Sequence, residues 1–201
     1  MSERIRMGRL SIDVIDFAGA LATIEKRIET RAGGTIFTPN VDHVVLVERD
    51  LRFREAYARA TLSLVDGTPV LWAARLLGSR LPEKVSGSDL VVPLAERAAA
   101  RGWRVFLLGG GPGVGELAAA KLKQLYPTLD IVGMASPMID IDGDPAPRKA
   151  VAADIAATRP DLVLAALGTP KQEIFCDEVR DLLAPAVLVG IGAGIDFVAG
   201  T

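Results

Sequence analysis

At several points of this sequence, polar residues follow directly after apolar runs. The stretch "GTPKQEIF", residues 168–175, follows "DLVLAAL", in which the first residue alone is charged. Lys171, Gln172 and Glu173 therefore begin the element that follows a buried strand. Polar groups at the edge of a core need partners, so these three side chains are candidates for contact with a ligand.

A carboxylate ends another apolar run, in "SLVDGTP", where Asp66 is followed by Gly67. At the floor of a crevice, such a group is a candidate general base, and burial raises its pKa. An aspartate before glycine is also common in turns, where it bonds to its own backbone. The spacing alone favours neither interpretation.

The stretch "FTPNVDH" places Thr38, Asn40 and His43 within two helical turns, and His43 is the only histidine of the chain. Asn40 is predicted to cap the helix that follows. His43 could act as a base, but a lone histidine on a helix more often packs half-buried, and this second interpretation is favoured.

Three glycines join an apolar strand to a helix in "LLGGGPGVGE". Backbone N–H groups at a helix start attract oxyanions, so Gly109, Gly110 and Gly111 are expected to contact a ligand. The stretch does not match the dinucleotide pattern G-x-G-x-x-G, because Val114 stands at its third glycine, and it has no P-loop lysine.

Aspartates alternate in "PMIDIDGDPAP", at positions 140, 142 and 144. A calcium loop would carry glutamate at its twelfth position, which is Val151 here. We therefore expect a solvated loop and no metal site. Cys176 has no metal-ligand partner nearby in the sequence and is predicted to pack in the core.

Apolar runs of strand length alternate with amphipathic segments along the whole chain. We expect strands at 9–15, 34–39, 61–67, 103–110, 129–135, 161–168 and 186–194. We expect helices at 17–31, 41–49, 51–60, 68–77, 88–102, 111–127, 147–160 and 169–183. Asp16 and Asp50 are predicted to cap the helices that follow them, and Gly102 to end the helix at 88–102. This alternation predicts an α/β fold, with a Rossmann-like parallel sheet and helices on both faces. Ligands of such sheets bind beyond the carboxyl ends of the strands, where every candidate stretch except the 140–144 loop is expected to lie.

Composition narrows the class of protein. The 201 residues suit one domain, 1–201, and half of them are apolar. A net charge of −2 gives no reason to expect nucleic-acid binding. One cysteine excludes an internal disulfide and fits a reducing compartment. Neither a secretory signal nor a run of eighteen apolar residues is present.

Seven motifs in order resemble the WecG/TagA/CpsF family of bacterial glycosyltransferases, over about residues 9–201. They are "FTPNVDHVVL", "LVDGTPVLWAARLLG", "LPEKVSGSDLV", "VFLLGGGPGV", "YPTLDIVG", "LGTPKQEIF" and "VGIGAGIDFVAG". The resemblance implies transfer of a sugar, N-acetylmannosamine or a related hexose, from a UDP-sugar to a polyprenyl-diphosphate-linked acceptor. It also implies inversion at the anomeric carbon, with no metal or cofactor. The products would feed cell-surface polysaccharides such as teichoic acid linkage units and exopolysaccharide.

The resemblance also assigns roles to residues. Asp66 matches the family's catalytic aspartate and Thr38 its active-site threonine. Lys84 stands where the family has an arginine, so the planar guanidinium fork is lost here. The remaining substrate-binding matches and candidates are Asn40, Gly109, Gly110, Gly111, Gln172, Gly192 and Asp196.

Family members usually continue past the "D-F-AG" motif into a basic C-terminal appendage that touches the membrane, whereas this chain stops at Thr201. We therefore expect an incomplete site, a membrane surface met through the missing tail, and a peripheral place at the inner face of the cytoplasmic membrane. Whether the chain forms a homo-oligomer is left open. Two alternatives stay open: an NAD(P)-dependent oxidoreductase, and a non-catalytic nucleotide-binding module.

Overall fold

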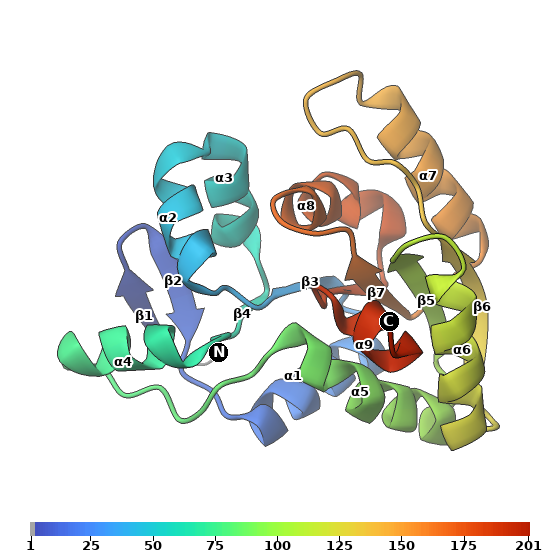
Figure 1. The fold of residues 1–201 in the computed structure, drawn as a ribbon, viewed down its shortest axis with the longest axis horizontal. Coiled ribbons are helices and arrows are strands. Elements are labelled where there is room, and N and C mark those ends of the chain that lie inside the picture. The colour runs from blue at the N-terminus through green and yellow to red at the C-terminus, as the bar shows by residue number, and fades with distance from the viewer. Residues whose placement is uncertain (1–2) are drawn as a thin grey trace.

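Six parallel strands form the central sheet of the computed structural model, which describes residues 3–201 (Figure 1). Their order is β4-β3-β8-β7-β5-β6. The strands are β3 (Gly34–Phe37), β4 (Leu62–Ser63), β5 (Arg104–Gly109), β6 (Asp130–Ala135), β7 (Leu162–Ala166) and β8 (Val187–Gly190). With helices on both faces, the sheet confirms the predicted Rossmann-like α/β fold.

Each face of the sheet carries its own hydrophobic cluster. One cluster lies under α2 (Val41–Arg49), α3 (Leu51–Arg59), α7 (Ala146–Ala157) and α8 (Lys171–Leu183). The other lies under α1 (Phe17–Glu29), α5 (Gly87–Arg101), α6 (Val114–Leu125) and α9 (Gly194–Ala199). Because side chains alternate along a strand, Phe37 packs in the first cluster and its neighbour Ile36 in the second.

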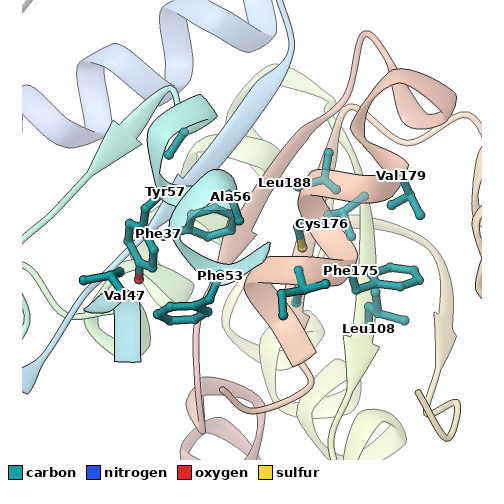
Figure 2. Packing of buried hydrophobic residues seen from close by; sticks show 14 of the residues in the cluster. Phe37, Val47, Phe53, Ala56, Tyr57, Leu108, Phe175, Cys176, Val179 and Leu188 are labelled. Atoms are coloured by element: carbon teal, nitrogen blue, oxygen red, sulfur yellow. The ribbon is translucent and has the colours of Figure 1, made fainter. Parts of the chain in front are cut away.

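Aromatic side chains concentrate on one face. Figure 2 shows Phe53 and Tyr57 of α3 beside Phe37 of the sheet, with Phe175 and Cys176 on the facing helix α8. The rings of Phe53 and Tyr57 meet edge to face, with their centroids 5.1 Å apart. The predicted packing role of Cys176 is confirmed, and burial raises the pKa of its thiol.

Helix ends follow the expected capping chemistry. The carboxylate of Asp16 accepts from the N–H of Gly19 at 2.7 Å, and that of Asp50 accepts from Phe53 at 3.0 Å. Gly102 ends α5 in the left-handed conformation. These bonds are local, which explains why the sequence predicts them. A proline inside a helix removes one N–H donor, yet α5 runs through Pro93.

Three segments differ from the prediction. The expected strand at 9–15 is β2 (Leu10–Asp13), which pairs antiparallel with β1 (Arg4–Met7) in a separate two-stranded sheet. The expected strand at 61–67 is reduced to the two residues of β4 at the sheet edge. The expected strand at 186–194 ends at Gly190, and α9, a helix that the sequence pattern did not predict, begins at Gly194.

Candidate active site

The loops after β3, β4 and β8 meet at the carboxyl end of the sheet. The N–H of Asp66 donates to the carbonyl of Pro39 at 2.9 Å, which joins the loops after β4 and β3. Gly87, at the start of α5, packs so closely that a Cβ there would lie 2.7 Å from the carbonyl oxygen of Gly190 and 3.0 Å from Oγ1 of Thr38. Three loops and one helix start therefore surround the same point.

Asp66 lies half-buried at this point, and its carboxylate makes no hydrogen bond within residues 3–201. Gly67, with a φ of 99°, begins α4 (Thr68–Leu76) without a side-chain cap. The turn interpretation requires a bond from Asp66 to its own backbone, and the described part of the chain contains none. The lone pairs of the carboxylate are thus free to accept a proton from a ligand.

The surroundings raise the pKa of Asp66 above its usual range. Burial is the largest cause, and the nearby charge of Asp89 adds to it. The charges of Lys84 and His43 act in the opposite direction, and burial prevails. Lys84 is exposed, and its Nζ lies 3.1 Å from the carboxylate of Asp89. A carboxyl group with a raised pKa is a better proton acceptor near neutral pH.

Thr38 and Asn40 follow β3 and differ in what their side chains do. The side chain of Thr38 is buried at the junction of the loops. Oδ1 of Asn40 accepts from the N–H of Asp42 at 2.9 Å and of His43 at 3.3 Å. The predicted cap is confirmed, and the amide nitrogen of Asn40 makes no hydrogen bond among the described residues.

His43 is buried against the rings of Phe53 and Tyr57. Its Nδ1 lies 2.6 Å from Oδ1 of Asn40 and 3.3 Å from the backbone nitrogen of the same residue. Nε2 lies 2.9 Å from Oγ1 of Thr169, within hydrogen-bond distance. Both ring nitrogens are thus occupied, which agrees with the favoured packing interpretation and makes His43 a poor candidate for the base.

Gln172 and Glu173 are buried in the first turn of α8. Oε1 of Gln172 accepts from the N–H of Gly192 at 3.1 Å, and its Nε2 donates to Glu173 at 3.0 Å. The sequence pattern predicts that Gln172 faces the ligand, but its side chain is only 3% exposed and joins α8 to the loop after β8. Gln172 thereby fixes the position of Gly192.

Glu173 was a candidate for ligand contact, with no role of its own assigned from the sequence. Its Oε1 lies 3.5 Å from both Nε2 of His43 and Oγ1 of Thr169. Its Oε2 has no hydrogen-bond partner in the part of the chain that the structure describes, and neither has the hydroxyl of Tyr57. Burial, together with the charges of Glu173 and Asp66, raises the pKa of Tyr57. In the sequence, the one sign of such a role was the position of Glu173 shortly after an apolar run.

The glycine turn follows β5, at the same carboxyl end of the sheet. Four strand spacings separate β4 from β5, or about 19 Å. Gly109 has a φ of 105°, and a Cβ there would lie 2.1 Å from the carbonyl oxygen of Ala166, so only glycine fits. With Gly111 and Ser136, Gly109 lines an open hollow of about 430 Å³. Asp196 is half-buried in the first turn of α9, which follows β8, and β8 lies between β4 and β5 in the sheet.

The alternating aspartates stabilise their own loop. Oδ1 of Asp140 accepts from the N–H groups of Asp142 at 3.0 Å and Gly143 at 3.2 Å. Oδ1 of Asp144 accepts from Ala146 at 2.9 Å. These are the contacts of a surface loop before α7.

Among residues 3–201, no helix combines the length and hydropathy that crossing a bilayer requires.

A family model and two known proteins match this sequence over most of its length. The sequence model of the Glycosyl transferase WecG/TagA/CpsF family matches residues 5–201. A Bacillus spizizenii protein named N-acetylglucosaminyldiphosphoundecaprenol N-acetyl-beta-D-mannosaminyltransferase is 30% identical over 195 residues, which cover 94% of this chain and 74% of the relative. A Bacillus subtilis protein of the same name is 31% identical over 173 residues, which cover 86% and 65%.

Proposed function

The chain belongs to the WecG/TagA/CpsF family of glycosyl transferases, and we propose that it moves a sugar from a UDP-sugar to a polyprenyl-diphosphate-linked acceptor. The names of two relatives describe N-acetylmannosaminyl transfer to such an acceptor, and we infer N-acetylmannosamine or a related hexose as the sugar here. The observation that carries the proposal is the half-buried carboxylate of Asp66, free of hydrogen bonds within the described chain, at the ligand end of the sheet.

The proposed reaction is one in-line displacement that inverts the anomeric centre. The acceptor hydroxyl oxygen bonds to the anomeric carbon, and the bond from that carbon to the β-phosphate oxygen of UDP breaks on the opposite side. The hydroxyl proton passes to the carboxylate of Asp66. The raised pKa of Asp66 suits this step, because its carboxylate is a stronger base than that of an exposed aspartate.

Departure of UDP requires stabilisation of negative charge on its diphosphate. Lys84 is a cation close enough to Asp66 to affect its pKa. Backbone N–H groups of the glycine turn and the start of α6 offer further donors. The family resemblance implies that no metal takes part, so this charge stabilisation would come from protein groups and from any segment beyond the present chain.

The remaining site residues would orient the donor along the sheet edge. An extended ligand fits the separation of about 19 Å between the ends of β4 and β5. A nucleoside diphosphate sugar has this form, with its sugar near Asp66 and Thr38 and its nucleoside near Gly109. Gln172 would act by holding Gly192 in place, and Asp196 could accept from a ligand hydroxyl between the two ends.

Action on a polyprenyl-linked acceptor would take place at a membrane surface, and we infer the inner face of the cytoplasmic membrane. Residues 3–201 would serve as one catalytic core, because both hydrophobic clusters share the same sheet. The relatives are longer than the aligned parts, so segments outside this core could contribute to the whole enzyme.

Ligand-dependent stabilisation tests the proposal. UDP and a UDP-hexosamine should raise the melting temperature, by the equivalent of about 2.7 kcal/mol at a hundredfold excess over Kd. NAD and NADP should have no effect, and chelator should not reduce the response to UDP. A shift with NAD and none with UDP would restore the oxidoreductase alternative. Binding of UDP-sugar without transfer, by a chain that carries whatever C-terminal segment its natural protein has, would favour the non-catalytic module.

A further inference from the structure

Large apolar side chains are exposed together on α4. Trp72 is 60% exposed, Leu76 is 89% exposed and Leu77 is 66% exposed. Trp72 and Leu76 lie one turn apart on the same face of the helix, and Val70 and Ala74 on the opposite face are buried. Figure 1 shows α4 at one end of the molecule. We call Trp72, Leu76 and Leu77 the α4 patch.

Two arginines flank the α4 patch. Arg75 and Arg80 are exposed and form no ion pair within the described residues, and with Gly78, Leu81 and Pro82 they line an open hollow of about 690 Å³. Residues 67–82 contain no acidic residue, although the whole chain has a net charge of −2. The surface thus combines apolar side chains with local positive charge, as amphipathic helices at anionic lipid surfaces do.

The patch lies close to the candidate base. Asp66 is two residues before α4, and Trp72 lies about 6 Å along the helix from its first residue, Thr68, at 1.5 Å per residue. The diphosphate of a polyprenyl-linked acceptor lies at the depth of the lipid headgroups, since its chain is in the bilayer. A helix lying in that interface would hold Asp66 near the reacting end of the acceptor.

We propose that α4 docks the protein on anionic membranes, with the α4 patch among the acyl chains and Arg75 and Arg80 on lipid phosphates. The inference rests on the proposed function only for the reason why the protein would dock on a membrane. The docking itself is argued from the exposed apolar side chains and arginines. A second copy of the chain is a less suitable occupant, because a symmetric contact through this face would bring four arginines together. The docking surface lies within the described chain, whereas the family resemblance places membrane contact in a tail beyond it.

Tryptophan fluorescence tests the proposal directly, because the chain has two tryptophans and Trp103 is buried. In Trp103→Phe, emission from Trp72 should shift to the blue with vesicles of phosphatidylcholine and phosphatidylglycerol, and much less with phosphatidylcholine alone. In Trp72→Phe, the emission should not change. Should Trp103→Phe fail to fold, quenching by brominated lipids in the unchanged chain, compared with Trp72→Phe, makes the same measurement.

Vesicle co-sedimentation of variants tests which groups bind. Leu76→Ser should weaken binding roughly tenfold, from the lost apolar burial, and Arg75→Gln or Arg80→Gln about fivefold each, from one charge at the surface. Added salt should weaken binding of the unchanged chain. Leu125→Ser is the matched control, because Leu125 is 60% exposed at the end of α6, on the opposite side of the molecule. This variant should bind like the unchanged chain.

Several results would overturn the proposal. These are vesicle binding that Leu76→Ser does not weaken, Trp72 emission that vesicles do not alter, or a dimer in sedimentation experiments that Leu76→Ser converts to monomers. A soluble, short-chain acceptor distinguishes this failure from failure of the proposed function. With that acceptor, Leu76→Ser should keep the turnover of the unchanged chain. If no transfer occurs while Trp72 still enters anionic vesicles, the function is wrong and the docking surface stands.

Discussion

Replacement of Asp66 by asparagine removes the proton acceptor while it keeps the size of the side chain. The carboxylate makes no hydrogen bond in the described chain, so the change leaves no partner unsatisfied. If Asp66 is the base, turnover should fall roughly 10²–10⁴-fold. This range corresponds to about 2.7–5.4 kcal/mol of transition-state stabilisation. Affinity for the donor should change little, because the base acts on the acceptor hydroxyl.

The raised pKa of Asp66 also predicts how Asp66→Asn changes the free energy of unfolding at each pH. Since the folded state holds the proton more tightly than the unfolded state does, the charge of Asp66 costs stability as pH rises through the raised pKa. The asparagine of Asp66→Asn carries no charge, so the variant should be as stable as the parent or slightly more stable at neutral pH. Any gain should disappear in acid, below the ordinary pKa of an aspartate, where Asp66 is protonated in both states.

The assay combines three measurements on one preparation: turnover with a UDP-hexosamine and a short-chain polyprenyl acceptor, donor affinity, and melting temperature at neutral and acid pH. The chain used should carry whatever C-terminal segment its natural protein has. Asp181→Asn, in an exposed part of α8, serves as the control and should change none of them. Turnover of Asp66→Asn within twofold of the parent would remove Asp66 from the mechanism, whatever the melting temperatures.

Three further predictions concern the surroundings of the site and the core. Lys84→Gln should raise the pKa of the candidate base and move the acid limb of the pH–turnover profile to higher pH, while Asp89→Asn should move it to lower pH; an acid limb unmoved in both would contradict the assigned charges. Gly109→Ala should destabilise the fold strongly, because its Cβ would lie 2.1 Å from a backbone carbonyl oxygen, whereas Gly113→Ala, also at positive φ but facing open space, should cost only about 1 kcal/mol in melting experiments. Cys176 should resist thiol reagents until the chain unfolds, because it is fully buried and the pKa of its thiol is raised; labelling in native buffer at the rate of a free thiol would show otherwise.

Local chemistry explains what the sequence determined about this protein. Alternation of apolar runs and amphipathic segments predicted the parallel sheet, and single side chains predicted the caps at Asp16, Asn40 and Asp50. A cap bonds to an N–H two or three residues away, so both partners are visible in a short stretch. Asp66 and Gly109 were predictable as site candidates because each stands at the end of an apolar strand. The family was predictable from seven motifs that occur in order along the chain.

Tertiary structure alone decided what these residues face. The sequence could not show that Gln172 turns inward to Gly192, twenty positions away, or that Glu173 meets His43 on another helix. It also left open whether Asp66 bonds to its own turn. Each of these outcomes depends on packing between segments far apart in the chain, and the same packing leaves Trp72 exposed on α4. Hydrogen bonds to near neighbours are encoded locally, whereas burial and electrostatic environment arise only once distant strands and helices come together.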